Sequence, residues 1–246
     1  MTVVSISVIF PVYNEEENIL PILDATIPVL SSLTNNFEII FVDDGSTDRT
    51  PEILQKTKHV TVYTLKRNMG KATALYIGFQ KATKEVIITM DSDLQDDPKE
   101  IPRLLAKITE GYDFVNGWKQ TKHQEHTSPL KRLSSRFFNN LTYLFTGVDV
   151  HDFNCPFKAY KRHVAKDLFL YGELHRYIPV QVGTLGYKYT EVPVSNYPRR
   201  FGKTKYGTKR LLRGFLDLIT ITYLAGYKNR PLHAFGSIGL FFFGVG

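Results

Sequence analysis

Four short apolar runs, each followed by a longer segment of helical character, constrain the fold of this chain more than any other feature. The runs cover residues 6–13, 37–42, 60–65 and 86–90. Strands that alternate with helices in this way form βαβ units, which build a parallel sheet. The runs are continuously hydrophobic, as expected for strands that helices cover on both faces. We therefore predict an α/β fold with a mostly parallel sheet flanked by helices.

Polar and mostly acidic residues follow these runs directly. In open parallel sheets the ligand binds in the crevice at the carboxyl ends of the strands. We therefore expect a site at this edge, built from Asn14 and Glu15 after the first run, Asp43 and Asp44 after the second, residues 66–68 after the third, and Asp91, Ser92 and Asp93 after the fourth.

Asp91 and Asp93 are candidate ligands of a divalent cation. We expect both to point to the same face of a strand end, with Gln95 close by. Hard oxygen ligands favour Mg²⁺ or Mn²⁺, and such an ion would bridge diphosphate oxygens. An Asp-x-Asp pattern alone is equally typical of a solvated acidic turn, but its position after a buried strand favours the metal.

The two halves of the chain carry opposite charge. Residues 1–117 contain 11 Lys and Arg against 17 Asp and Glu, a formal charge of −6, whereas residues 118–246 contain 20 against 7, a charge of +13. An acidic half suits a cation, and a basic half suits phosphates or anionic lipid. Nucleic acid fits the charge equally well, but no nucleic-acid-binding motif is present, so we do not expect it as a partner. The single cysteine, Cys155, is consistent with a reducing compartment.

Four segments in register resemble the family 2 glycosyltransferases of the Rossmann-like GT-A fold. They are residues 11–15 (PVYNE), 43–46 (DDGS), 67–72 (RNMGKA) and 91–95 (DSDLQ). The resemblance implies inverting transfer from a UDP- or GDP-sugar, with Asp91, Asp93 and Gln95 at the metal. It also implies donor nucleotide binding by Pro11, Tyr13, Asn14, Glu15, Asp43, Asp44, Lys71, Asp91 and Ser92.

Downstream segments narrow this resemblance to one branch. Residues 152–161, 172–179 (GELHRYIP) and 198–206 (PRRFGKTKY) are similar to the polyprenyl-phosphate glycosyltransferases, including the dolichol-phosphate mannose synthases. The resemblance implies transfer of a hexose to undecaprenyl or dolichyl phosphate, for the synthesis of wall or surface glycans. Relatives often have Ser-Gly where this chain has Cys155-Pro156, and proline fixes the backbone. That difference leaves the shape of the acceptor or sugar pocket open.

Asp152 corresponds to the catalytic base of relatives that activate a hydroxyl. A phosphate acceptor, with a second pKa near ~6, is largely dianionic at neutral pH and needs no strong base. Asp152 is then expected to position acceptor, sugar or metal, and a purely structural cap is the alternative. The residues predicted to act in catalysis are Asp93, Asp152, Arg200 and Lys203.

A lipid phosphate and a diphosphate donor repel each other, by several kcal/mol at ~4 Å and an effective dielectric of about 20. Basic side chains must offset this repulsion. Arg200 and Lys203 are the first candidates, because Gly202 between them permits a loop that folds over phosphates. His175 is equally typical of a structural residue, and Trp118 of packing or of sugar stacking. The predicted acceptor and phosphate ligands are Lys119, Arg132, Arg136, His175, Arg176 and Lys205.

The last part of the chain has a composition suited to membranes. We predict a catalytic domain over 1–208, an interfacial helix over 209–230, and the beginning of a membrane-spanning segment over 231–246 that continues in a longer chain. Residues 234–246 are uncharged but fewer than the ~20 that a span needs. We expect the protein at the cell membrane, with its catalytic domain on the cytoplasmic side.

Two other functions remain open on the sequence alone. One is a family 2 enzyme that extends a polysaccharide or modifies another non-lipid acceptor. The other is a non-catalytic membrane protein that binds nucleotide sugar or anionic lipid, against which the intact pair Asp91 and Asp93 argues. The identity of the sugar, the choice between uracil and guanine, and homo-oligomerisation are not fixed by any motif.

Overall fold

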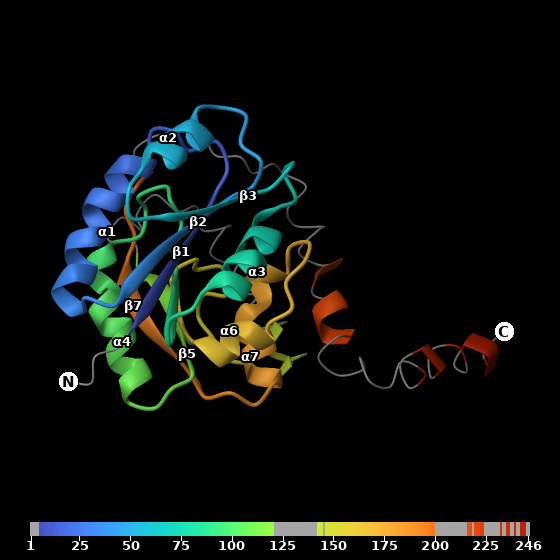
Figure 1. Ribbon diagram of the computed structural model, residues 1–246. Coiled ribbons are helices and arrows are strands. Elements are labelled where there is room, and N and C mark those ends of the chain that lie inside the picture. The colour runs from blue at the N-terminus through green and yellow to red at the C-terminus, as the bar shows by residue number, and fades with distance from the viewer. Residues whose placement is uncertain are drawn as a thin grey trace.

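A seven-stranded sheet forms the centre of the molecule in the computed structural model (Figure 1). The structure describes residues 5–120, 142–144 and 146–199, together with residues 216–217, 219–223, 232, 235–236, 239 and 242–244. The strand order is β3-β2-β1-β4-β6-β5-β7. Strands β1, β2, β3 and β4 run parallel, as do β5 and β7, and only β6 runs antiparallel to its neighbours β4 and β5. The predicted α/β fold with a mostly parallel sheet is confirmed.

The first half of the chain follows the predicted alternation of strand and helix. All four apolar runs form strands, although β3 lies at the edge of the sheet with its first and last residues exposed, so that it is less covered than expected. The elements are β1 (Ile6–Val12), α1 (Ile19–Leu33), β2 (Phe37–Asp43), α2 (Thr50–Lys56), β3 (Thr61–Thr64), α3 (Lys71–Lys81) and β4 (Val86–Thr89).

The second half adds three strands, none of which is among the four apolar runs described above. Strand β6 has the sequence KAYK, and its two lysines are not typical of a buried strand. The hydrogen-bond partners of these lysines come from other segments. The elements are η1 (Pro98–Glu100), α4 (Ile101–Thr109), β5 (Phe114–Gln120), β6 (Lys158–Lys161), α6 (Arg162–Asp167), η3 (Leu174–Tyr177), α7 (Ile178–Thr184) and β7 (Tyr189–Ser195).

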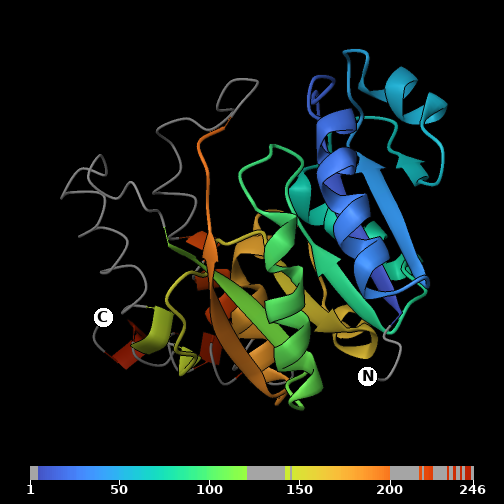
Figure 2. The same ribbon diagram turned by 90° about the vertical axis from the view of Figure 1, so that its left-hand side faces the viewer.

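Helices cover both faces of the sheet and bury a core on each. Helices α1 and α4 pack on one face, and α3, α6 and α7 on the other (Figures 1 and 2). Strand β1 supplies both cores in alternation, since Val8 and Phe10 belong to the first core and Ile9, between them, to the second. This double coverage explains the continuously hydrophobic runs.

The predicted interfacial helix and membrane segment lie mostly outside the described residues. Within 209–230, residues 216, 217 and 219–223 are helical, and Ile221 is buried in a small cluster with Val180 and Tyr177. Among the described residues, no helix combines the length and the hydropathy that crossing a bilayer demands.

Candidate active site at the carboxyl edge of the sheet

The loops after β1 and β2 are joined by hydrogen bonds at the carboxyl edge of the sheet. Asn14 has a left-handed backbone conformation (φ 53°), which asparagine tolerates. Its backbone N–H donates to Ser46 Oγ at 2.9 Å, and its Oδ1 accepts from the backbone N–H of Thr47 at 2.8 Å. The backbone N–H of Glu15 donates to Thr50 Oγ1 at 2.9 Å. Half-buried Tyr13 and the other predicted residues of this segment therefore form one wall with the loop after β2.

Asp43 and Asp44 are both buried, but their carboxylates have different partners. Asp43 Oδ1 accepts from the backbone N–H of Ser46 at 3.0 Å, whereas Asp43 Oδ2 has no hydrogen-bond partner within the described part of the chain. Both oxygens of Asp44 are used, by the backbone N–H groups of Met69 at 2.7 Å and Gly70 at 2.9 Å. Burial, and then the neighbouring Asp43, raises the pKa of Asp44. Asp44 thus orders the turn before α3, and Asp43 keeps one acceptor atom for a ligand.

Gly45 allows this arrangement because the two loops touch at that point. Its φ is +72°, and a Cβ there would lie 2.6 Å from the backbone carbon of Arg67. Any other residue would push the 43–46 turn away from the segment that Asp44 binds.

Asp91 and Asp93 lie in a turn, not in the strand. Strand β4 ends at Thr89, so the strand alternation that we expected to aim both side chains at one face does not operate here. The turn itself brings them together, with Leu94 in the left-handed region at φ 60°. A leucine in that conformation is strained, and such strain is frequent at functional sites.

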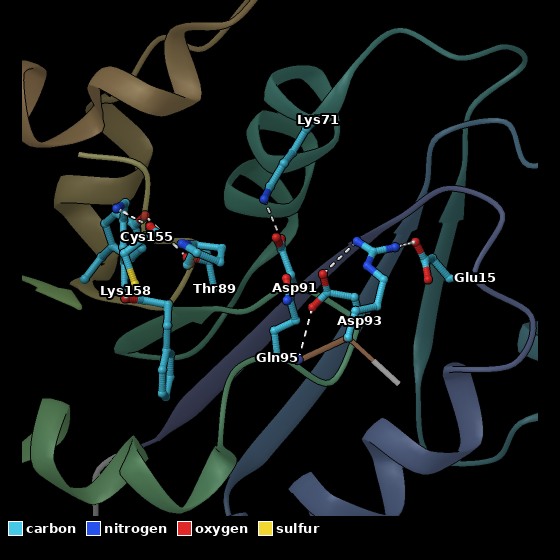
Figure 3. Close-up of polar contacts among 12 residues, drawn as sticks. Glu15, Lys71, Thr89, Asp91, Asp93, Gln95, Cys155 and Lys158 are labelled. Atoms are coloured by element: carbon cyan, nitrogen blue, oxygen red, sulfur yellow. Dashed lines mark hydrogen bonds and ion pairs between the residues drawn. The ribbon is translucent and has the colours of Figure 1, made fainter. Parts of the chain in front are cut away.

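Each of these two carboxylates is paired with a basic side chain from another segment. Lys71, at the first position of α3, reaches Asp91 Oδ1, and Arg199, beyond β7, holds Asp93 Oδ2 at 2.8 Å. The same guanidinium lies 3.5 Å from Glu15 Oε1. Figure 3 shows Lys71 pointing from α3 toward Asp91, with Asp93 and Glu15 beside it. The edge therefore holds two acidic groups that already attract positive charge.

Asp93 is the more deeply buried of the pair. Its side chain is 6% exposed, against 30% for Asp91. Burial and then the neighbouring Asp91 carboxylate raise the pKa of Asp93, while Arg199 lowers it. The described residues contain no group of three or more His, Cys, Asp and Glu arranged around a metal. A divalent ion here would take one or two carboxylates from the protein and the rest of its ligands from phosphates and water, the usual arrangement for Mg²⁺.

Gln95 connects this turn to the segment after β7. Its backbone carbonyl accepts from the N–H of Tyr197 at 2.8 Å, and its side-chain Nε2 donates to the carbonyl of Tyr197 at 3.3 Å. Ser92, in the same turn, is buried. Asp96, which follows Gln95, is fully buried, and burial raises its pKa to about 7 while Lys119 opposes that rise. Lys119, predicted as a phosphate ligand, thus has Asp96 as its main electrostatic partner, and this raises its pKa.

A second polar network lies where β5, β6 and β7 meet. Lys158 is fully buried, and its Nζ donates to Asn116 Oδ1 at 2.5 Å and to the backbone carbonyl of Cys155. Asn116 Nδ2 donates to Glu191 Oε1 at 2.8 Å and to the carbonyl of Asp152 at 2.8 Å. Burial lowers the pKa of Lys158 to about 8. The network therefore holds the backbone around the predicted site residue Asp152.

Aromatic packing continues this network to the surface. Glu191 Oε2 accepts from the backbone N–H of His151 at 2.7 Å and lies 2.8 Å from its ring nitrogen. The His151 ring stacks on Trp118 with centroids 4.0 Å apart. Packing, one of the two roles predicted for Trp118, is confirmed. Asp152 Oδ1 accepts from the N–H of Asn154 at 2.9 Å, which is the local cap considered as its alternative role.

The remaining predicted residues fall into two groups. His175 and Arg176 lie in η3, where Arg176 forms an ion pair with Glu173 at 2.7 Å, which gives Arg176 a local structural partner. Arg199, Lys158 and Glu191 are not among the site residues that the sequence predicts, and the only signal for Arg199 is its place in the segment 198–206. Predicted ligands that lie outside the described residues are Arg132, Arg136, Arg200, Lys203 and Lys205.

Comparisons with solved structures agree with this architecture. Glucosyl-3-phosphoglycerate synthase from Mycobacterium tuberculosis, solved with Mn²⁺ and UDP-glucose, aligns with a TM-score of 0.67 at 19% identity, over 90% of this chain and 79% of that one. The same enzyme with phosphoglyceric acid gives a TM-score of 0.68 at 20% identity, over 90% and 80% of the two chains. At this level of identity the similarity shows a shared fold.

Sequence comparisons identify closer relatives. The chain is 35% identical to a dodecaprenyl-phosphate galacturonate synthase of Rhizobium johnstonii, over 96% of this chain and 71% of the relative. It is 36% identical to an undecaprenyl-phosphate 4-deoxy-4-formamido-L-arabinose transferase of an Enterobacter species, over 95% and 71% of the two chains. The family model described as glycosyl transferase family 2 matches residues 7–169, from β1 past Asp152. This protein is therefore a member of glycosyl transferase family 2.

Proposed function

We propose that this protein is an inverting, metal-dependent enzyme that transfers a sugar from a nucleoside diphosphate donor to a polyprenyl phosphate. The observation that carries the proposal is the pair Asp91 and Asp93, which follows β4 and lies at the same sheet edge as the acceptor atom Asp43 Oδ2. The two similar enzymes described above are named for dodecaprenyl phosphate and undecaprenyl phosphate, which supports this acceptor class.

The spacing of the strands suits a nucleoside diphosphate. Strand β1 lies between β2 and β4, so Asp43 and Asp91 are separated by two strand spacings, about 10 Å. Asp43 Oδ2 is a buried acceptor that requires a donor, and an N–H of a base or a ribose hydroxyl supplies one. The diphosphate then extends toward Asp91 and Asp93, while Asn14, Glu15 and the 69–70 turn border the nucleoside.

The donor set fits Mg²⁺ or Mn²⁺. Asp91 and Asp93 offer hard oxygens, and both already bind cationic side chains in this structure. A divalent ion at this place would neutralise the charge that develops on the departing nucleoside diphosphate. Gln95 would offer its side-chain oxygen as a further ligand.

A second anion must approach this site for the transfer to occur. Lys119, on β5, and the basic residues Arg132, Arg136, Arg200, Lys203 and Lys205 are the proposed ligands of the lipid phosphate. Asp152 positions the acceptor or the sugar, because a phosphate that is already ionised needs no strong base. The buried network of Lys158, Asn116 and Glu191 keeps the Asp152 backbone in place for this role.

We propose that the enzyme works at the cytoplasmic face of the membrane, with residues 209–230 in the interface. Its support is the exposed apolar surface near the carboxyl end of the described chain. Leu232 is 78% exposed and Phe243 is 87% exposed, values that lipid contact would relieve. The beginning of a membrane-spanning segment over 231–246 stays a proposal.

Incubation of the purified protein with undecaprenyl phosphate, Mn²⁺ and radiolabelled UDP- and GDP-sugars tests the proposed function. The sugars should include uronic acids and amino sugars as well as hexoses, because the named relatives differ in the sugar. Label in the lipid extract, lost without undecaprenyl phosphate, is the expected result. Labelled polymer without a lipid requirement would favour the polysaccharide alternative, and no transfer from any donor would overturn the proposal.

A further inference from the structure

Arg199 is the side chain that compensates the buried charge of Asp93. It comes from the segment after β7, lies 2.8 Å from Asp93 Oδ2, and reaches Glu15 at 3.5 Å. Asp93 is nearly inaccessible, so its ionised carboxylate requires a close positive partner. Arg199 is itself about one-quarter exposed, and is therefore accessible to a ligand that enters from solvent.

A metal ion bound through the same oxygen would compete with this guanidinium. Two cations on one carboxylate oxygen lie only a few ångströms apart and repel each other strongly in a partly buried site. A metal ion on Asp91 would likewise compete with Lys71, although the Asp91 carboxylate is more exposed than that of Asp93. A metal ion bound through Asp93 Oδ2 would therefore displace Arg199 from that oxygen.

The backbone keeps Arg199 near the site after such a displacement. The segment before it is attached to the metal-side turn by the bond from Tyr197 N–H to the Gln95 carbonyl and by a bridge between Asp96 and Asn196. Only the side chain has to move. A guanidinium binds phosphate oxygens through two parallel hydrogen bonds, so the donor diphosphate on the metal is a suitable new partner.

We propose that Arg199 is an internal counter-ion of Asp93 that the divalent cation replaces, and that the released guanidinium then binds the donor diphosphate. This inference rests on the proposed function, because it requires both a metal and a nucleotide at this edge. It makes Arg199 a donor-binding residue whose removal changes metal affinity and nucleotide affinity in opposite directions.

Binding of Mn²⁺ alone, measured by electron paramagnetic resonance on the full chain, tests the first step. Arg199→Ala should bind Mn²⁺ about tenfold more tightly than wild type, because the guanidinium that competes for Asp93 Oδ2 is gone. Calorimetric titration with UDP or GDP at saturating Mn²⁺ tests the second step, and the same variant should bind nucleotide about tenfold more weakly. Damage to the site would weaken both.

Two further variants separate charge from position. Arg199→Lys keeps the charge and loses the paired donors, so Mn²⁺ affinity should stay near wild type while nucleotide affinity falls. Arg103→Ala removes an arginine that pairs with Glu100 on the exposed side of α4, and both affinities should stay unchanged. Thermal denaturation establishes that each variant is folded, and Arg199→Gln replaces Arg199→Ala if the latter is not.

The outcomes distinguish this inference from the proposed function. If wild type binds Mn²⁺ and transfers sugar, but removal of Arg199 leaves Mn²⁺ affinity unchanged or lowers it, the counter-ion role is wrong and the enzyme assignment stands. If Mn²⁺ affinity rises but nucleotide affinity does not fall, the second step is wrong. If wild type binds no Mn²⁺ and transfers nothing, both proposals are overturned.

Discussion

Two polar clusters in this protein differ in the partners that compensate their charges. At the sheet edge after β4, Asp91 is paired with Lys71 and Asp93 with Arg199, and both cations are long, partly exposed side chains from other segments. Between β5, β6 and β7, the cation Lys158 is fully buried and its partners are an amide and backbone carbonyls. The first cluster can exchange its partners with a ligand, whereas the second is fixed by the fold.

The reason for this difference is what each cluster costs to open. A partly exposed cation that leaves its carboxylate regains water, and an arriving metal ion takes over the compensation of the carboxylate charge. A buried ammonium cannot, and its partners would be left without hydrogen bonds in the core. Substitutions should therefore affect activity at the first cluster and stability at the second.

The largest effect is expected at Asp93. Asp93→Asn keeps the shape of the side chain but removes its charge. The proposed metal would then be bound more weakly, and the charge that develops on the diphosphate would be less well stabilised. We expect turnover to fall by at least about 100-fold. Initial rates with radiolabelled donor measure it, and the thermal midpoint should stay within a few degrees of wild type. Full activity in this variant would contradict the role of the first cluster.

Lys158→Met should act on stability. The substitution leaves Asn116 Oδ1 and the Cys155 carbonyl buried without a donor, so the free energy of unfolding should fall by about 3 kcal/mol. Urea denaturation measures the change. Lys161→Met, which removes a partly exposed lysine from the same strand, is the matched control and should cost less than about 1 kcal/mol. Equal losses in the two variants would show that the burial of Lys158 does not increase its contribution to the free energy of unfolding.

The pH dependence sharpens the same point. Burial lowers the pKa of Lys158 to about 8 from an ordinary value of 10.5. Between these values the unfolded chain keeps the proton that the folded protein has lost, so the free energy of unfolding rises with pH. Relative to Lys158→Met, wild type should gain about 2 kcal/mol from pH 8 to pH 10. Denaturation series at both pH values measure it, and a flat difference would contradict a buried, ionised lysine below pH 8.

Asp44→Ala should cost less. It removes two hydrogen bonds to the backbone N–H groups of Met69 and Gly70, and we expect the free energy of unfolding to fall by about 2 kcal/mol. If Asp44 acts mainly by ordering that turn, nucleotide affinity should fall less than in Asp43→Ala, which loses the acceptor Oδ2. Calorimetric titration of both variants with UDP and GDP makes this comparison, and the reverse order would assign direct binding to Asp44.

The smallest effect is expected at an exposed ion pair. Arg49 lies 3.3 Å from Glu16, and its side chain is 74% exposed, so solvent screens the pair. Arg49→Ala should change the free energy of unfolding by less than about 0.5 kcal/mol. Chemical denaturation checks this value. A larger loss would mean that ion pairs in this protein resist separation even when they are exposed, which would contradict the exchange of partners inferred for the first cluster.

The sequence alone determined the parallel half of the fold and the acidic edge. Apolar runs of strand length between helical segments specify β1 to β4, and the residues directly after a strand must lie at its carboxyl end, which placed Asp43, Asp44, Asp91 and Asp93 at one edge. These are local relations along the chain, and short-range pattern is enough to read them. The family relationship followed from the same motifs.

Only the tertiary structure decided which side chains meet. Strand β6 looks polar until Asn116, 42 residues earlier, is seen to accept from Lys158. Arg199 and Asp93 are 106 residues apart, and nothing local distinguishes Arg199 from its neighbour Arg200. The pairing of charges depends on how strands are ordered and on what each position can reach in space, and a one-dimensional pattern does not contain that information.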